Sequence, residues 1–121
     1  MHDRTDRPTC ALLITADDVF DFQLDLDNTL ACTRFALGCE RVDVVALTTR
    51  YDMWIDDEGL YNHPVNPAAT ALARSFGFTF QSYHGPVLIA GVTPDGDTVG
   101  LTSEQMAGLL KRLVSALDMV V

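Results

Sequence analysis

The sequence predicts an α+β domain in which a mainly antiparallel sheet packs against three helices. Segments with strand patterns outnumber helical ones, and tight turns at 57–59 and 93–97 are typical of hairpins. The helical segments do not alternate regularly with the strands, as a doubly wound parallel sheet would require. A chain of 121 residues has the size of one domain. We therefore expect a single domain over residues 9–121, preceded by a flexible lead-in at residues 1–8.

Strand patterns occur in apolar runs and in segments where apolar and polar residues alternate. The clearest alternation begins at Phe20, where aromatic and leucine side chains share one face and Asp21 and its neighbours share the other. Near the C-terminal end, Asp95-Gly96 supplies the chemistry of a hairpin turn. The expected strands cover residues 10–15, 19–26, 41–49, 51–56, 87–92 and 98–101. A further short extended stretch is expected at residues 78–80.

Helix start and stop signals delimit the three helices. Gly38 ends a helix expected over 29–37, and Asn66 caps a helix that begins at Pro67 and continues to residue 76. Thr102 and Gln105 form a capping box before an amphipathic helix over 103–117. The residues expected in the core are Leu13, Phe22, Leu24, Leu26, Phe35, Val45, Trp54, Leu72, Phe76, Leu88, Ile89, Leu109 and Leu113.

The charge balance restricts the partners of this protein. Seventeen acidic residues against eight basic ones give a net charge of −9, which repels nucleic acid and anionic membranes. No apolar run reaches the length of a membrane span and the N-terminus has no signal-peptide pattern, so we expect a cytoplasmic protein. The three cysteines contain no C-x-x-C pair and fit small buried residues in a reducing compartment.

Neither a metal nor a cofactor is predicted. His63 and His84 have no cysteine or histidine partner at zinc-ligand spacing, and no pattern places either one beside Cys39. The acidic turns at 56–58 and 95–97 lack the ligand frame of a calcium loop. A glycine loop that could cradle phosphate is also absent. We therefore predict no catalytic, cofactor-binding or metal-binding residues.

One short motif supports an alternative function. Asp25-Leu26-Asp27-Asn28-Thr29 resembles motif I of the haloacid dehalogenase superfamily, and residues 44–48 resemble its motif II. The resemblance implies that Asp25 is a nucleophile and Asp27 an acid/base in a magnesium-dependent phosphatase. However, the only lysine, Lys111, lies in the terminal amphipathic helix with no acidic metal-binding pair after it. The alternating segment before Asp25 is also unlike a central parallel strand, which is apolar on both faces.

A second resemblance covers about residues 51–113 and extends weakly back to residue 24. It consists of an acidic turn ending at Gly59, an N-x-x-A-T helix start at Asn66, a G-x-V-x-I-x-G strand from Gly85, a D-G hairpin and an L-T-x-E-Q helix start. In this order the motifs resemble the family catalogued as domain of unknown function 3846. The resemblance implies a small accessory protein of phages, plasmids and their actinobacterial hosts, and it brings no catalytic residues.

Elimination and charge together predict a non-enzymatic interaction protein that binds a host or phage protein with a basic surface. Acidic residues on the alternating segment and in the following turns are the candidate partner contacts: Asp17, Asp18, Asp21, Asp25, Asp56, Asp57 and Glu58. Self-association is a neighbouring possibility, because the last residues from Leu117 onward are mostly apolar. Mimicry of nucleic acid would require acidic side chains spaced like phosphates along one face.

Overall fold

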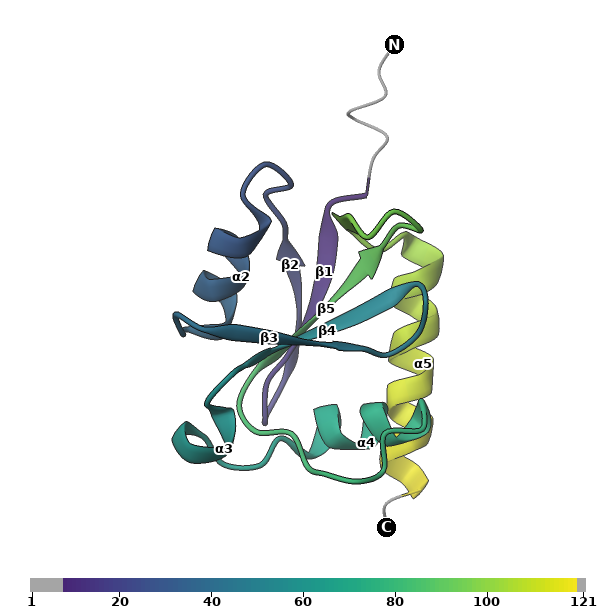
Figure 1. Ribbon diagram of the computed structural model, residues 1–121. Coiled ribbons are helices and arrows are strands. Elements are labelled where there is room, and N and C mark those ends of the chain that lie inside the picture. The colour runs from purple at the N-terminus through teal and green to yellow at the C-terminus, as the bar shows by residue number, and fades with distance from the viewer. Residues whose placement is uncertain (1–7, 120–121) are drawn as a thin grey trace.

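The sheet in the structure, a computed structural model that describes residues 8–119, is antiparallel at every described pairing (Figure 1). The strand order is β2-β1-β5-β4-β3, with β6 beside the end of β5. The predicted α+β class with a mainly antiparallel sheet is therefore confirmed. The strands are β1 (Cys10–Ile14), β2 (Val19–Gln23), β3 (Val42–Ala46), β4 (Tyr51–Asp56), β5 (Val87–Val92) and β6 (Thr98–Val99).

The described residues form four helices, one more than the sequence predicts. They are α2 (Thr29–Leu37), α3 (Gly59–Asn62), α4 (Pro67–Ser75) and α5 (Ser103–Met119). The sequence indicates only a turn and an irregular stretch where α3 lies, because four residues are too few to show a helical period. Helix α2 lies on one side of the sheet, whereas α4 and α5 lie on the other (Figure 1).

The central strand β5 contributes to two cores, one on each face of the sheet. Val87 and Ile89 pack with residues of α4 and α5, and Leu88 and Ala90 pack against the α2 side. This explains the continuous apolar run in β5, since a strand covered on both faces has no solvent-facing side chains. The first core also includes Leu12, Ile14, Met53, Leu72, Leu109 and Leu113.

The prediction of a buried Phe35 is wrong, because its side chain is 81% exposed. Helix α2 instead buries Thr33 and Leu37, which are four residues apart and share a face that Phe35 does not. The other predicted core residues are buried or half-buried. Strand β2 also ends three residues before the end of the alternating pattern, at Gln23, where the chain turns toward α2.

In each edge strand, one backbone N–H is bonded to the side chain of the preceding aspartate. The backbone N–H of Val19 in β2 donates to the carboxylate of Asp18 at 2.9 Å. In β3 the N–H of Val44 donates to the carboxylate of Asp43 at 2.8 Å. Each edge therefore has a backbone donor that is already occupied by the preceding aspartate, which discourages pairing with another chain.

Most of the flexible lead-in predicted at residues 1–8 lies outside the described residues. Pro8 is described, and its carbonyl accepts a hydrogen bond from the N–H of Gly100 at 3.2 Å. A Cβ atom at position 100 would lie 2.5 Å from the Pro8 backbone, so this close approach requires glycine. Among the residues described here, no helix is long and apolar enough to cross a membrane.

Candidate functional site

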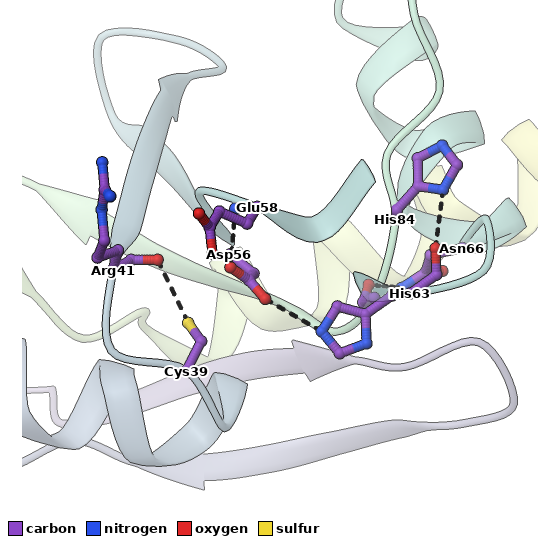
Figure 2. Close-up of polar contacts among 8 residues, drawn as sticks. Cys39, Arg41, Asp56, Glu58, His63, Asn66 and His84 are labelled. Carbon is purple, nitrogen blue, oxygen red and sulfur yellow. Dashed lines mark hydrogen bonds and ion pairs between the residues drawn. The ribbon is translucent and has the colours of Figure 1, made fainter. Parts of the chain in front are cut away.

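A buried carboxylate at the end of β4 holds the segment that contains α3. Asp56 is only 6% exposed. One of its oxygens accepts the N–H of Glu58 at 2.9 Å, and the other lies 3.1 Å from Nε2 of His63 (Figure 2). Its place in the acidic turn predicts that Asp56 contacts a partner at the surface. Its side chain is buried, so this prediction is wrong. In that turn only Asp57 and Glu58 are exposed to a partner.

A second histidine ties this segment to the loop before β5. Nδ1 of His84 lies 3.1 Å from the carbonyl oxygen of His63, so this nitrogen carries the proton (Figure 2). Nε2 of His84 lies 2.9 Å from the hydroxyl oxygen of Ser82. Two glycines permit the close approach. A Cβ at Gly59 would lie 2.6 Å from the His84 carbonyl oxygen, and one at Gly85 would lie 2.5 Å from the His63 ring.

Asn66 adds to the contacts of Asp56, His63 and His84, which together form a hydrogen-bonded framework next to α3. Its buried side chain accepts the N–H of Ala69 at 3.0 Å, which confirms the predicted helix cap. The same amide donates to the carbonyl oxygens of Ile14 at 3.0 Å and Gly85 at 2.8 Å. One side chain therefore joins β1, the start of α4 and the loop before β5. Because every polar atom of this amide is paired, the framework has a single well-defined arrangement.

Large apolar side chains project into solvent from this framework. Leu60 and Tyr61 of α3 are 66% and 86% exposed, and Phe80 in the loop after α4 is 93% exposed. Leu60 lines a small cleft of about 200 Å³ together with Gln81, the neighbour of Phe80, so α3 and this loop adjoin. The cleft is also lined by acidic residues, Asp43 and Asp57. We call Leu60, Tyr61 and Phe80 with the acidic residues Asp43, Asp57 and Glu58 the α3 surface.

A second cleft of about 450 Å³ lies beside the Asp56–His63 pair and is lined by Cys39 and Arg41, among others. The Cys39 thiol is 3.5 Å from the carbonyl oxygen of Arg41 (Figure 2). Burial, and then the nearby Asp56 carboxylate, raise the pKa of Cys39. The thiol therefore stays protonated at neutral pH, which is the reverse of what an activated cysteine nucleophile requires. Within residues 8–119, no three histidine, cysteine or acidic side chains lie close enough together to hold a metal ion.

The other predicted contact residues fall into two groups. Asp17 and Asp18 are exposed in the β1–β2 turn, which lies at the same end of the sheet as α3 and α4 (Figure 1). Asp21 is exposed in β2, and Asp25 is exposed in the turn that leads to α2, at the opposite end (Figure 1). The structure therefore places Asp17 and Asp18 at the same end as the α3 surface, and it separates Asp25 from them.

The two aspartates of the phosphatase alternative lie in a solvent-exposed turn. The carboxylate of Asp25 accepts the N–H of Asp27 at 3.0 Å, so it stabilises the turn before α2. Strand β2 ends two residues before Asp25 and pairs in antiparallel fashion with β1. The motif that this segment resembles follows a strand of a parallel sheet directly.

Comparison with known proteins identifies the family. A family model described as Domain of unknown function (DUF3846) matches residues 11–114, which is most of the chain. The chain belongs to this family. The match confirms the resemblance found over residues 51–113 and, more weakly, from residue 24, and it extends it back through β2 and most of β1, so it covers both edges of the sheet. No curated protein and no solved structure matches the chain.

The Asp56–His63 pair is the feature of this DUF3846 domain that sequence patterns do not reveal. The two residues are seven positions apart, and their contact depends on α3 reversing the chain between them. The glycines at 59 and 85 were the available signal. Placing Gly59 at the end of a turn and Gly85 at the start of a strand motif misses the close backbone approach at Gly59 and the ring packed over Gly85.

Proposed function

We propose that this protein binds another protein through the α3 surface, acting without catalysis. The observation that carries the proposal is the exposure of Leu60, Tyr61 and Phe80 on segments that partly buried hydrogen bonds hold in place. Exposed apolar side chains on adjoining segments favour an interaction site. Aromatic side chains on a rigid support are also favourable anchors, because little conformational entropy is lost when they are buried by a partner.

Charge defines the chemistry of this partner. Asp43, Asp57 and Glu58 belong to the α3 surface, and Asp17 and Asp18 lie at the same end of the sheet. Arg41, which pairs with Asp57 at 3.2 Å, is the nearby counter-charge. With a net charge of −9, the protein attracts a partner that presents lysine or arginine around an apolar patch.

Side chains, rather than a sheet edge, make the contact in this proposal. Strand addition needs free backbone donors along an edge, and the N–H groups of Val19 and Val44 are already bonded to aspartates. The protein would act in the cytoplasm as an accessory protein of a phage or another mobile element. The exposed position of Asp25 and Asp27 in a turn does not favour the phosphatase alternative.

The test compares substitutions of exposed aromatic residues inside and outside the α3 surface. The partner is captured from a lysate of the organism that encodes the chain, and binding is then measured between the two purified proteins at about 0.15 M salt. Tyr61→Ser with Phe80→Ser should weaken binding at least tenfold. Phe35→Ser is the matched control, because Phe35 is 81% exposed on α2 and lies outside the α3 surface.

The salt dependence tests the charge argument separately. At about 1 M salt the Debye length falls to ~3 Å, so binding to a basic partner should weaken further. Equal effects of the α3-surface variant and the Phe35 control would overturn the proposed surface. Failure to capture any protein whose binding depends on Tyr61 and Phe80 would overturn the proposed function.

A further inference from the structure

Helix α5 has an apolar flank that the core does not cover. Leu109 and Leu113 are buried against the sheet. On the adjoining flank, Leu110 and Leu117 are each 38% exposed, and Val114 between them is 61% exposed. These three residues follow each other at spacings of four and three, which is the heptad spacing along which two helices pack together. We call Leu110, Val114 and Leu117 the α5 seam.

Two opposite charges border the α5 seam on its solvent side. Lys111 and Asp118 are exposed and are seven residues apart, so they occupy the same heptad position, about 10.5 Å apart along the helix. The other side of the seam is bordered by Leu113, which belongs to the core. A helix packed on the seam would therefore meet this pair of charges on one side only.

We propose that two copies of this chain associate through their α5 seams, with the helices antiparallel. A two-fold axis through the middle of the seam brings Lys111 of each copy close to Asp118 of the other, so both ion pairs form at once. A parallel two-fold arrangement would instead put the Lys111 and Asp118 side chains of the two copies on opposite sides of the interface, where they form no ion pairs. Charge complementarity thus selects both the second copy as occupant and the direction of its helix.

The dimer is expected to be weak. Three apolar side chains from each copy form a contact smaller than the ~1,200 Å² typical of stable complexes. The net charge of −9 on each copy also opposes association. Helices α3 and α5 are on opposite sides of the molecule in Figure 1. Dimer formation therefore leaves Leu60 and Tyr61 of the α3 surface free.

Sedimentation equilibrium of the full chain at protein concentrations up to about 1 mM and about 0.15 M salt tests the proposal. The wild type should show a concentration-dependent monomer–dimer equilibrium. Val114→Lys places a charge in the middle of the seam and should weaken dimerisation at least tenfold. Ser115→Lys is the matched control, because Ser115 is the exposed neighbour of Val114 and points away from the seam. Circular dichroism of each variant confirms folding.

A charge exchange tests the direction of the helices. Lys111→Asp and Asp118→Lys should each weaken dimerisation severalfold, and the double variant should restore it, because the exchanged charges again face each other. A wild type that is monomeric at about 1 mM, equal effects of Val114→Lys and Ser115→Lys, or a double variant that does not recover would each overturn the proposal. Dimerisation of the Tyr61→Ser, Phe80→Ser variant should be unchanged, which separates this test from that of the proposed function.

Discussion

Nε2 of His63 lies 3.1 Å from the carboxylate of Asp56, and this contact joins the two ends of the segment that contains α3. The pair is partly shielded from solvent, since the Asp56 side chain is 5% exposed and that of His63 is 29% exposed. A helix of four residues cannot be stable alone. The geometry of the α3 surface therefore depends on contacts beneath it.

Gly85→Ala should destabilise the protein by about 3 kcal/mol or more in chemical denaturation. Gly85 has a φ of +81°, and a Cβ there would overlap the His63 ring at 2.5 Å. Gly77→Ala is the control, because Gly77 also has a positive φ but nothing lies within 4 Å of its Cβ. Its cost should be only the backbone strain, about 1 kcal/mol.

The double variant Gly85→Ala, His63→Ala isolates the steric contribution. Without the ring, the added methyl group loses its two closest contacts and keeps only the one with the Cβ of residue 63, at 3.0 Å. The cost of Gly85→Ala measured in the His63→Ala background should fall toward that of Gly77→Ala. An unchanged cost would show that His63 does not pack over Gly85 in solution.

The two asparagines that precede helices should respond differently to substitution. Asn66 caps α4 and also binds two carbonyl oxygens while fully buried, so Asn66→Ala should cost about 2–4 kcal/mol. Asn28 precedes α2 but makes no cap hydrogen bond, so Asn28→Ala should cost less than about 0.5 kcal/mol. Equal losses in urea titrations would contradict the described roles.

Partial burial raises the pKa of Asp52 in β4. The folded state thus binds a proton at this carboxylate more readily than the unfolded state does, and its negative charge lowers stability at neutral pH. Asp52→Asn should therefore stabilise the protein at pH 7, and this advantage should decrease as the pH falls through the pKa of the folded state and vanish below that of the unfolded state. Asp95→Asn removes the same formal charge from an exposed turn. It serves as the control in thermal unfolding at pH 7 and at an acidic pH where Asp52 is protonated in both states.

The raised pKa of Cys39 predicts slow alkylation. Site-resolved mass spectrometry with iodoacetamide should find that the rate at Cys39 reaches half its maximum at a pH above that of a free cysteine. Arg34 lowers the pKa of this thiol, so Arg34→Gln should shift the midpoint to a still higher pH. Arg50→Gln removes an exposed charge from the β3–β4 turn and should leave the midpoint unchanged.

The elements with strong local signals are predicted from the sequence. Strands β4 and β5 and helix α2 have the predicted bounds, and α5 begins at the predicted residue after its Thr102–Gln105 capping box. These segments carry alternation, an apolar run or caps, all of which are local properties of the chain. Strand β2 is shorter than its alternation predicts, because the pairing with β1 goes no further than the bond from the N–H of Leu24 to Thr9 and the chain turns at Asp25.

The candidate site is harder to predict because its contacts are not local. Asn66 is predicted as a cap, yet its bonds to Ile14 and Gly85 span 52 and 19 residues. Asp56 looks like one of three surface acids, and only the fold shows that it turns inward while Asp57 stays exposed. No residue pattern distinguishes the exposed Tyr61 or Phe80 from a core aromatic, since exposure depends on which elements cover them.

The position of β5 in the sheet has a consequence for how the chain assembles. The hairpins β1–β2 and β3–β4 are complete in sequence long before residue 87, yet β5 is the strand that lies between them. Until β5 is synthesised, each hairpin has an inner edge without its partner and an apolar face without a cover. The sheet must therefore close late, through pairings between distant parts of the chain, and such topologies fold slowly. A chain truncated before residue 87 should accordingly be captured by chaperones or degraded rather than remain as a smaller folded domain.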